Sequence, residues 1–243
     1  MIRKIIPNML TVGNLVIGFF AILLILDDVE NNLAFASFLI ILAMLTDGLD
    51  GRVARRLGVT SEFGKELDSL CDVVSFGIAP AAIIYMASLH EYGVMGMAVS
   101  CLFPVAGALR LARFNVHAGT PGYFTGLPIT AAGGALATFA LYTQAFTPFV
   151  IMLITLFLAF LMVSQIKYPN FKKVGWPRHT LQIIAVTVVL VGILAWFFPK
   201  EFTKIVFIPL AVYAVYGISK NILIAIRRAR HKSDDDEETS YRY

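Results

Sequence analysis

Charged residues are scarce in this chain, because Asp, Glu, Lys and Arg together make up only 15% of its 243 residues. A soluble domain carries about 25% charged and about 45–50% apolar residues. Here 58% of the residues are hydrophobic, and the mean hydropathy is +0.76. This shortage of charge excludes an ordinary soluble domain. Several apolar runs approach the roughly 20 residues that a helix needs to cross a bilayer, so the sequence predicts a polytopic membrane protein.

Cysteine is also rare, and its two positions, Cys71 and Cys101, both lie in apolar runs. This excludes a disulfide-rich scaffold and favours packing roles for the thiols. The chain lacks the alternating segments of about ten residues that build transmembrane barrels, so the spans are expected to be helices. No nucleic-acid binding is expected, because the basic residues form short runs without a recognition module. The predicted fold class is all-α, a polytopic membrane helix bundle.

About eight transmembrane helices are expected, separated by glycine, proline and charged residues. With both termini cytoplasmic, most of the 20 Lys and Arg fall on the cytoplasmic side, as the positive-inside rule requires. Residues 1–230 are expected to form one membrane domain, and the polar residues 231–243 a disordered cytoplasmic tail. The expected helices are residues 10–26, 33–46 with a helical continuation, 68–88, 93–114, 126–146, 149–167, 181–198 and 203–226.

Residues 47–72 concentrate the charge on which chemistry depends. Asp47 and Asp50 are spaced i,i+3, and Asp68 and Asp72 are spaced i,i+4, so each pair lies on one helix face. Four converging carboxylates repel one another, and bound cations relieve that repulsion. Oxygen ligands favour Mg²⁺ or Mn²⁺, and four carboxylates suffice for two ions about 3.5–4 Å apart. Two such ions are suited to binding a diphosphate.

The residues between the aspartate pairs are candidates for binding the rest of such a substrate. Gly58 and Gly64 are expected to end helices, which folds the chain back and brings the pairs together. Arg55 suits bidentate pairing with phosphate oxygens, Gly51 and Gly64 permit close approach to the backbone, and Ser61 offers a hydroxyl donor. Taken singly, Arg55 is explained equally well as a positive-inside residue, and the glycines as helix caps.

The pattern D-x2-D-G-x2-A-R-x8-G-x3-D-x3-D runs without a gap from Asp47 to Asp72. It resembles the CDP-alcohol phosphatidyltransferase family, integral membrane enzymes that displace CMP from a CDP-linked lipid or alcohol with a second alcohol. The resemblance implies that the four aspartates hold two metal ions and that Asp72 is also the proton acceptor. It further implies that Gly51, Arg55 and Ser61 contact the CDP-lipid. It also implies a core of six spans, with two of the expected helices outside it, and the homodimers common in the family.

Two later stretches, RLARFN at 110–115 and FTGLPITAA at 124–132, resemble the phosphatidylserine synthase branch of this family. That resemblance implies CDP-diacylglycerol and L-serine as substrates. Serine needs a cation for its carboxylate, supplied by Arg110 or Arg113, and an acceptor for its ammonium, supplied by Asn115. The two arginines are spaced i,i+3 and are expected on one helix face. Phosphatidylglycerophosphate synthase is the alternative, because glycerol 3-phosphate also requires arginines.

Asn8 and Thr11 belong to a polar edge on the first helix, which either lines the CDP-lipid pocket or caps the helix. A transporter or cation channel is the alternative from another class, because aspartates inside spans also serve ion pathways. That class favours acidic residues near the membrane midplane and broken helices in matching halves. Here the aspartates gather at one predicted face, and no inverted repeat is visible. The sequence therefore favours a metal-dependent lipid enzyme that acts at the cytoplasmic face of the cell membrane.

Overall fold

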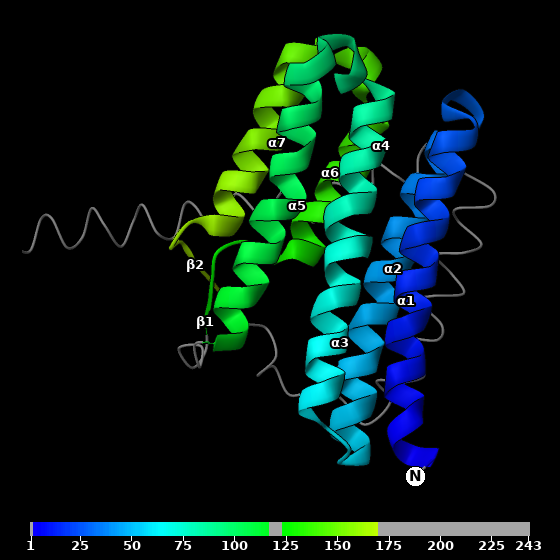
Figure 1. The fold of residues 1–243 in the computed structure, drawn as a ribbon, viewed down its shortest axis with the longest axis vertical. Helices are drawn as coiled ribbons and strands as arrows, with labels where there is room; N and C mark the ends of the chain where they lie inside the picture. Colours follow the sequence, from blue (N-terminus) through cyan, green and yellow to red (C-terminus); the bar gives the residue numbers. More distant parts are fainter. Residues whose placement is uncertain (1, 117–122, 170–243) are drawn as a thin grey trace, which may run out of the picture.

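The computed structural model describes residues 2–116 and 123–169, and the seventh and eighth predicted helices and the C-terminal tail lie outside these residues. The described part is a helical bundle with one small sheet (Figure 1). Its elements are α1 (Ile2–Asp27), α2 (Val29–Leu57), α3 (Glu62–Asp72), the π-helix η1 (Val73–Ile78), α4 (Ala79–Ala87), the 3₁₀ turn η2 (Leu89–Tyr92), α5 (Gly93–Val116), β1 (Tyr123–Thr125), α6 (Ile129–Ala140), the 3₁₀ turn η3 (Thr143–Ala145), α7 (Pro148–Val163) and β2 (Lys167–Pro169).

Four helical segments of the described part are long and apolar enough to cross a membrane, which confirms the predicted helical membrane architecture. Large apolar side chains such as Phe19, Val94 and Phe160 are exposed on the bundle, as expected for surfaces that face lipid. α6 and α7 are apolar but shorter, with 12 and 16 residues. The chain is an integral membrane protein. The four segments are Pro7–Asp27, Val29–Leu57, Glu62–Ala87 and Leu89–Val116.

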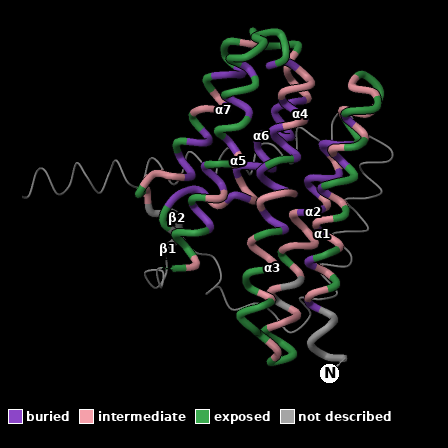
Figure 2. The backbone as a smooth tube through the Cα atoms, in the orientation of Figure 1, coloured by how far each residue is buried: buried purple, intermediate pink, exposed green. Residues whose placement is uncertain are grey.

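Successive spans run in alternate directions, as Figure 1 shows. The α1–α2 turn and the α4–α5 connection lie at one end of the bundle, and the N-terminus, the α2–α3 link and the end of α5 lie at the other. α1 and α2 pack side by side. The buried core lies where η1, α5 and α6 meet, around Phe76, Phe103 and Leu136 (Figure 2). The end that holds the α2–α3 link is less buried.

α2 has well-defined caps at both ends. At its start, the Asp28 carboxylate accepts hydrogen bonds from the Asn31 side chain at 2.6 Å and the Asn31 backbone N–H at 3.1 Å, and these lower the pKa of Asp28. At its end, Gly58 adopts a left-handed conformation with φ of 64°, which glycine tolerates best. The prediction that Gly58 ends a helix is confirmed, as is the helical continuation of α2 into the aspartate motif.

α3 begins six residues earlier than the expected start at Asp68. Ser61 caps it, because its side-chain oxygen accepts a hydrogen bond from the Gly64 N–H at 3.1 Å. The prediction that Gly64 ends a helix is therefore wrong, since Gly64 lies in the first turn of α3. The apolar pattern missed this turn because its residues are mostly polar, whereas the Ser61 side chain supplies the start signal. Asp68 and Asp72 consequently lie in the second half of α3.

A π-helical turn follows Asp72 directly. Within this turn, the Ala79 N–H donates to the carbonyl of Val74, five residues earlier. Pro80, at the start of α4, has no N–H to continue a regular α-helical ladder. Such turns occur frequently at functional sites. The expected helix 68–88 is thus a continuous span from α3 to α4 whose helical phase shifts next to the aspartates.

The loop before α6 is anchored to the end of α7. β1 pairs antiparallel with β2, with Phe124 opposite Tyr168. The Gly126 N–H donates to the Ile166 carbonyl at 2.8 Å, and the Leu127 N–H donates to the Leu161 carbonyl at 3.0 Å. The second bond satisfies a carbonyl at the end of α7 that has no helical partner. These contacts delay the start of α6 to Ile129. The helix expected at 126–146 also ends earlier, at Ala140.

Replacing Gly126 by alanine is expected to destabilise the protein by about 2–4 kcal/mol. Gly126 has φ of 78°, and an added Cβ would overlap the Met162 carbonyl oxygen. Strain and overlap therefore act together, and the loop that carries Pro128 is expected to detach from α7. Thermal unfolding of the purified protein in detergent measures this loss.

Two alanine substitutions serve as controls for Gly126→Ala. Gly58 also has positive φ, but nothing lies within 4 Å of an added Cβ, so Gly58→Ala is expected to cost only about 1–2 kcal/mol from strain. Gly13 has the same open space without positive φ, so Gly13→Ala is expected to stay within about 1 kcal/mol of the wild type. If Gly126→Ala and Gly58→Ala lose the same amount of stability, the overlap with the Met162 carbonyl contributes nothing to the loss.

Candidate functional site

Three aspartates from two helices come together at one place in the bundle. Asp47 of α2 and Asp68 and Asp72 of α3 each offer a carboxylate oxygen, and these oxygens lie within 4.8 Å of one another. Asp72 is only 7% exposed, and the other two are half-buried. Asp50 lies three residues after Asp47 on α2, but its side chain is outside the described residues. The fold-back of the chain thus brings both halves of the motif together.

This donor set fits a hard divalent cation. Carboxylates at this spacing repel one another when ionised, and a cation between them removes that cost. Carboxylate oxygens are the ligands that Mg²⁺ and Mn²⁺ prefer. Cys71, next to Asp72, is buried, whereas Cys101 is exposed. The carboxylate cluster is therefore suited to a divalent metal ion.

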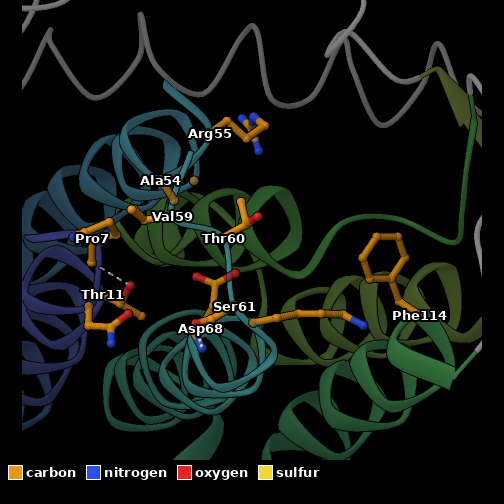
Figure 3. A pocket seen from close by; sticks show the side chains of 13 residues that line it. Pro7, Thr11, Ala54, Arg55, Val59, Thr60, Ser61, Asp68 and Phe114 are labelled. Atoms are coloured by element: carbon orange, nitrogen blue, oxygen red, sulfur yellow. Dashed lines mark hydrogen bonds between the residues drawn. The ribbon is translucent and has the colours of Figure 1, made fainter. Parts of the chain in front are cut away.

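A cavity of about 270 Å³ lies between the start of α1, the end of α2 and α3 (Figure 3). In Figure 3, Arg55 and Asp68 lie on opposite sides of this cavity, and Phe114 lies at its edge. All six residues predicted to contact the CDP-lipid line this one cavity, so the fold brings the whole predicted set together. These residues are Asn8, Thr11, Gly51, Arg55, Ser61 and Gly64.

The polar edge of α1 lies inside the helix, so the alternative that Asn8 or Thr11 caps it is wrong. The Thr11 hydroxyl donates to the Pro7 carbonyl at 3.1 Å. A Cβ added to Gly64 would lie 3.3 Å from the Asn8 Oδ1, so glycine keeps the space between α1 and α3 open. Asn14 is fully buried, and its carbonyl accepts a hydrogen bond from Ser75 at 3.0 Å.

A second cavity, of about 360 Å³, adjoins the first and contains the three clustered aspartates. Arg110 and Asn115 of α5 line it, together with the start of α6. Arg110 is 7% exposed, and its guanidinium carbon lies 5.9 Å from the centre of the Phe114 ring, a distance that permits a cation–π interaction. A buried cation and the Asp72 carboxylate therefore border the same space.

Arg113 lies in a different environment from Arg110, so the expectation that the two arginines share one face toward the acceptor is wrong. Arg113 is exposed, and its Nη1 donates to the Val163 carbonyl at 2.8 Å, at the end of α7. Residues three apart on a helix differ by about 60° in direction, which here separates an inward from an outward side chain. Arg113 stabilises the last turn of α7, and Arg110 is the arginine of the pair that lines the cavity.

Sequence reasoning missed several residues that line or support the second cavity. Lys65 and Ser69 flank Asp68 on α3, and both line it. The Lys65 ammonium donates to the Asn115 carbonyl at 3.3 Å. Phe114 also lines both cavities. The available signal for Ser69 was its position one residue after Asp68 and three before Asp72, on the turn between the two carboxylates.

The chain matches the CDP-alcohol phosphatidyltransferase family over residues 4–216. It is 36% identical over 229 residues to the CDP-diacylglycerol–serine O-phosphatidyltransferase of Helicobacter pylori strain J99, covering 91% of this chain and 92% of that one. It is 36% identical over 225 residues to the protein of the same name in Methanocaldococcus jannaschii, covering 91% and 97%. It is 38% identical over 174 residues to the archaetidylserine synthase of Methanothermobacter thermautotrophicus, covering 70% and 71%.

The family match extends well beyond the aspartate motif, because it includes all described residues from position 4 onward. The similarities agree with what the geometry supports on its own, namely helices long and apolar enough to cross a membrane and a carboxylate cluster that lines the second of two adjoining cavities. A chance match of the short aspartate pattern is excluded by this extent. The chain belongs to the CDP-alcohol phosphatidyltransferase family.

Proposed function

We propose that this enzyme transfers the phosphatidyl group of CDP-diacylglycerol to the hydroxyl of L-serine and releases CMP. The observation that carries the proposal is that Arg110 and Asn115 line the same cavity as Asp72. A cation for a carboxylate and an amide for an ammonium therefore border the carboxylate cluster. The relatives support the same acceptor, since serine is part of each of their names, even where the lipid differs.

In the proposed reaction, the serine oxygen attacks the phosphorus that bears diacylglycerol. The bond from that phosphorus to the CMP oxygen breaks, and CMP leaves with the electron pair. Asp72 accepts the hydroxyl proton during the attack, because a neutral alcohol is too weakly acidic to lose it beforehand. The Arg110 guanidinium pairs with the serine carboxylate, and the Asn115 amide oxygen accepts from the ammonium.

The first cavity is proposed to hold the nucleotide end of the donor. Arg55 is exposed at the boundary of the two cavities and suits the diphosphate. The other five predicted contacts surround the remaining space, and the acyl chains extend into the bilayer. Two Mg²⁺ or Mn²⁺ ions, held by Asp47, Asp50, Asp68 and Asp72, would when bound supply positive charge against the diphosphate and the departing CMP.

The site is proposed to face the cytoplasm, in a chain of eight spans with both termini on that side. The end of α2, the start of α3 and the end of α5 lie at the end of the bundle that holds the N-terminus (Figure 1). These segments carry the basic residues Arg55, Arg56, Lys65 and Arg113. Basic residues gather on the cytoplasmic side of membrane proteins. Serine and CMP are water-soluble, so a site at this end needs no path for them across the membrane.

An acceptor panel tests the function. With purified enzyme, CDP-diacylglycerol and Mg²⁺, CMP release is expected to require serine, with kcat/KM about 100-fold or more above that for glycerol 3-phosphate or inositol. The reason is that neither rival alcohol pairs with all the polar groups of the site. Both lack an ammonium for the amide oxygen, and inositol also lacks an anion for the arginine. Formation of phosphatidylglycerophosphate in place of phosphatidylserine would reassign the acceptor. If CMP is released with none of the alcohols in the panel, the transferase is rejected and the transporter alternative is favoured.

A further inference from the structure

The Asn115 side chain forms hydrogen bonds with residues of α3. Its Nδ2 donates to the Ser69 hydroxyl at 3.0 Å and lies 3.3 and 3.4 Å from the two carboxylate oxygens of Glu66. The Lys65 ammonium donates to the Asn115 main-chain carbonyl at 3.3 Å. These contacts join positions 46 to 50 residues apart in the chain. They fasten the end of α5 to α3 at the edge of the second cavity.

The chemistry of these partners determines which way the amide points. An ionised carboxylate can only accept hydrogen bonds, so the amide nitrogen of Asn115 must face Glu66. The Ser69 hydroxyl donates to the Lys65 carbonyl at 3.2 Å, so toward Asn115 it acts as an acceptor. Both partners therefore select Nδ2. The carbonyl oxygen Oδ1 is the amide atom that α3 leaves to the cavity, which Asn115 lines.

We propose that Glu66 and Ser69 are positioning residues that set acceptor specificity by presenting the Asn115 Oδ1 to the ammonium of serine. This inference rests on the proposed function. An ammonium carries only donors and needs an acceptor, which the observed orientation supplies. The opposite orientation would direct the donors of Nδ2 at the ammonium, which is a repulsive arrangement. An alcohol substrate that lacks an ammonium gains no hydrogen bond from the Asn115 Oδ1.

The test compares serine with 3-hydroxypropionate, which keeps the hydroxyl and the carboxylate of serine but lacks the ammonium. The serine KM, kcat and the constant for inhibition by 3-hydroxypropionate are measured in detergent micelles for each enzyme. The first variant is Glu66→Gln, whose amide can pair with either the oxygen or the nitrogen of the Asn115 amide. The second is Ser69→Ala, which removes the other hydrogen-bond acceptor for the Asn115 Nδ2. The controls are Ser69→Thr, which keeps a hydroxyl, and Glu62→Gln, which removes an acidic group one turn earlier on α3.

Glu66→Gln is expected to raise the serine KM about tenfold, because it removes a hydrogen bond to a charged group. Ser69→Ala is expected to raise it about fivefold, because it removes a hydrogen bond between neutral groups. In both variants, kcat, the KM of CDP-diacylglycerol and inhibition by 3-hydroxypropionate are expected to change less than about twofold. Ser69→Thr is expected to keep the serine KM that Ser69→Ala loses, because its hydroxyl remains an acceptor for the Asn115 Nδ2. Glu62→Gln is expected to match the wild type. The serine KM and the inhibition constant of 3-hydroxypropionate are measured on the same preparation. Neither constant changes if part of that preparation is unfolded.

Two results would overturn the inference. One is an unchanged serine KM in the double variant Glu66→Gln with Ser69→Ala. The other is an equal weakening of serine and 3-hydroxypropionate, because a purely structural latch between α3 and α5 would affect both ligands alike. Failure of the proposed function has a different signature, in which the wild-type enzyme itself shows no preference for serine.

Discussion

Asp72→Asn is expected to lower phosphatidyl transfer to serine about 10³-fold, within the usual range for loss of a general base. Asparagine keeps the size of the side chain but cannot accept the proton of the serine hydroxyl. Asp72 is 7% exposed, and water therefore has little access to replace it as base. CMP release measures the rate, and binding of radiolabelled CDP-diacylglycerol measures whether the donor site survives.

The control for this substitution is Asp27→Asn, at the opposite end of the bundle (Figure 1), which is expected to leave the rate unchanged. Because Asp72 also belongs to the carboxylate cluster, the assay is run over a range of Mg²⁺ concentrations. Donor binding that is partly retained with transfer lost fits the proposed base. A variant that turns over at the wild-type rate would show that the base lies elsewhere.

Asp68→Asn has the second large expected effect, on metal dependence. Removing one carboxylate from a cluster whose oxygens lie within 4.8 Å of one another is expected to raise the Mg²⁺ concentration for half-maximal activity more than about tenfold. At saturating Mg²⁺, kcat is expected to fall about 10²-fold, since the metal ion supplies several kcal/mol of charge stabilisation. Steady-state titrations give both quantities, and Mn²⁺ binding followed by electron paramagnetic resonance gives the affinity without turnover.

Glu62→Gln is the matched control for Asp68→Asn, because it neutralises an acidic residue of the same helix in its first turn. It is expected to leave the Mg²⁺ titration unchanged. Together the two variants separate loss of a ligand from a general change of charge on α3. Full activity of Asp68→Asn with an unchanged titration would remove Asp68 from the metal site.

The spans and the helix faces that carry the clustered carboxylates were predictable because their signals are local. Apolar runs identify helices regardless of what packs against them, and the spacing of Asp47, Asp68 and Asp72 fixes which helix faces carry carboxylates. The start of α3 was missed because its first turn is polar and only the cap at Ser61 marks it. The turn η1 was missed because a π-helix has no simple sequence signature.

The part of the second cavity that α5 lines was less predictable because it depends on contacts between distant segments. Arg110 and Arg113 look equivalent in the sequence, yet one is buried beside Phe114 and the other binds the end of α7. The role of Gly126 likewise depends on the approach of Met162. Helical spacing gives the angle between two side chains but not which neighbour each will meet.

The sequence by itself determined that this protein is a helical membrane protein whose aspartates lie in pairs on one face of a helix, because hydropathy and residue spacing act within single segments. Only the tertiary structure decided which arginine lines the cavity and which end of the Asn115 amide faces it. The physical reason is that both depend on hydrogen bonds and packing between α3, α5 and α7. Those contacts arise only when the helices assemble and each helix takes its rotation against its neighbours.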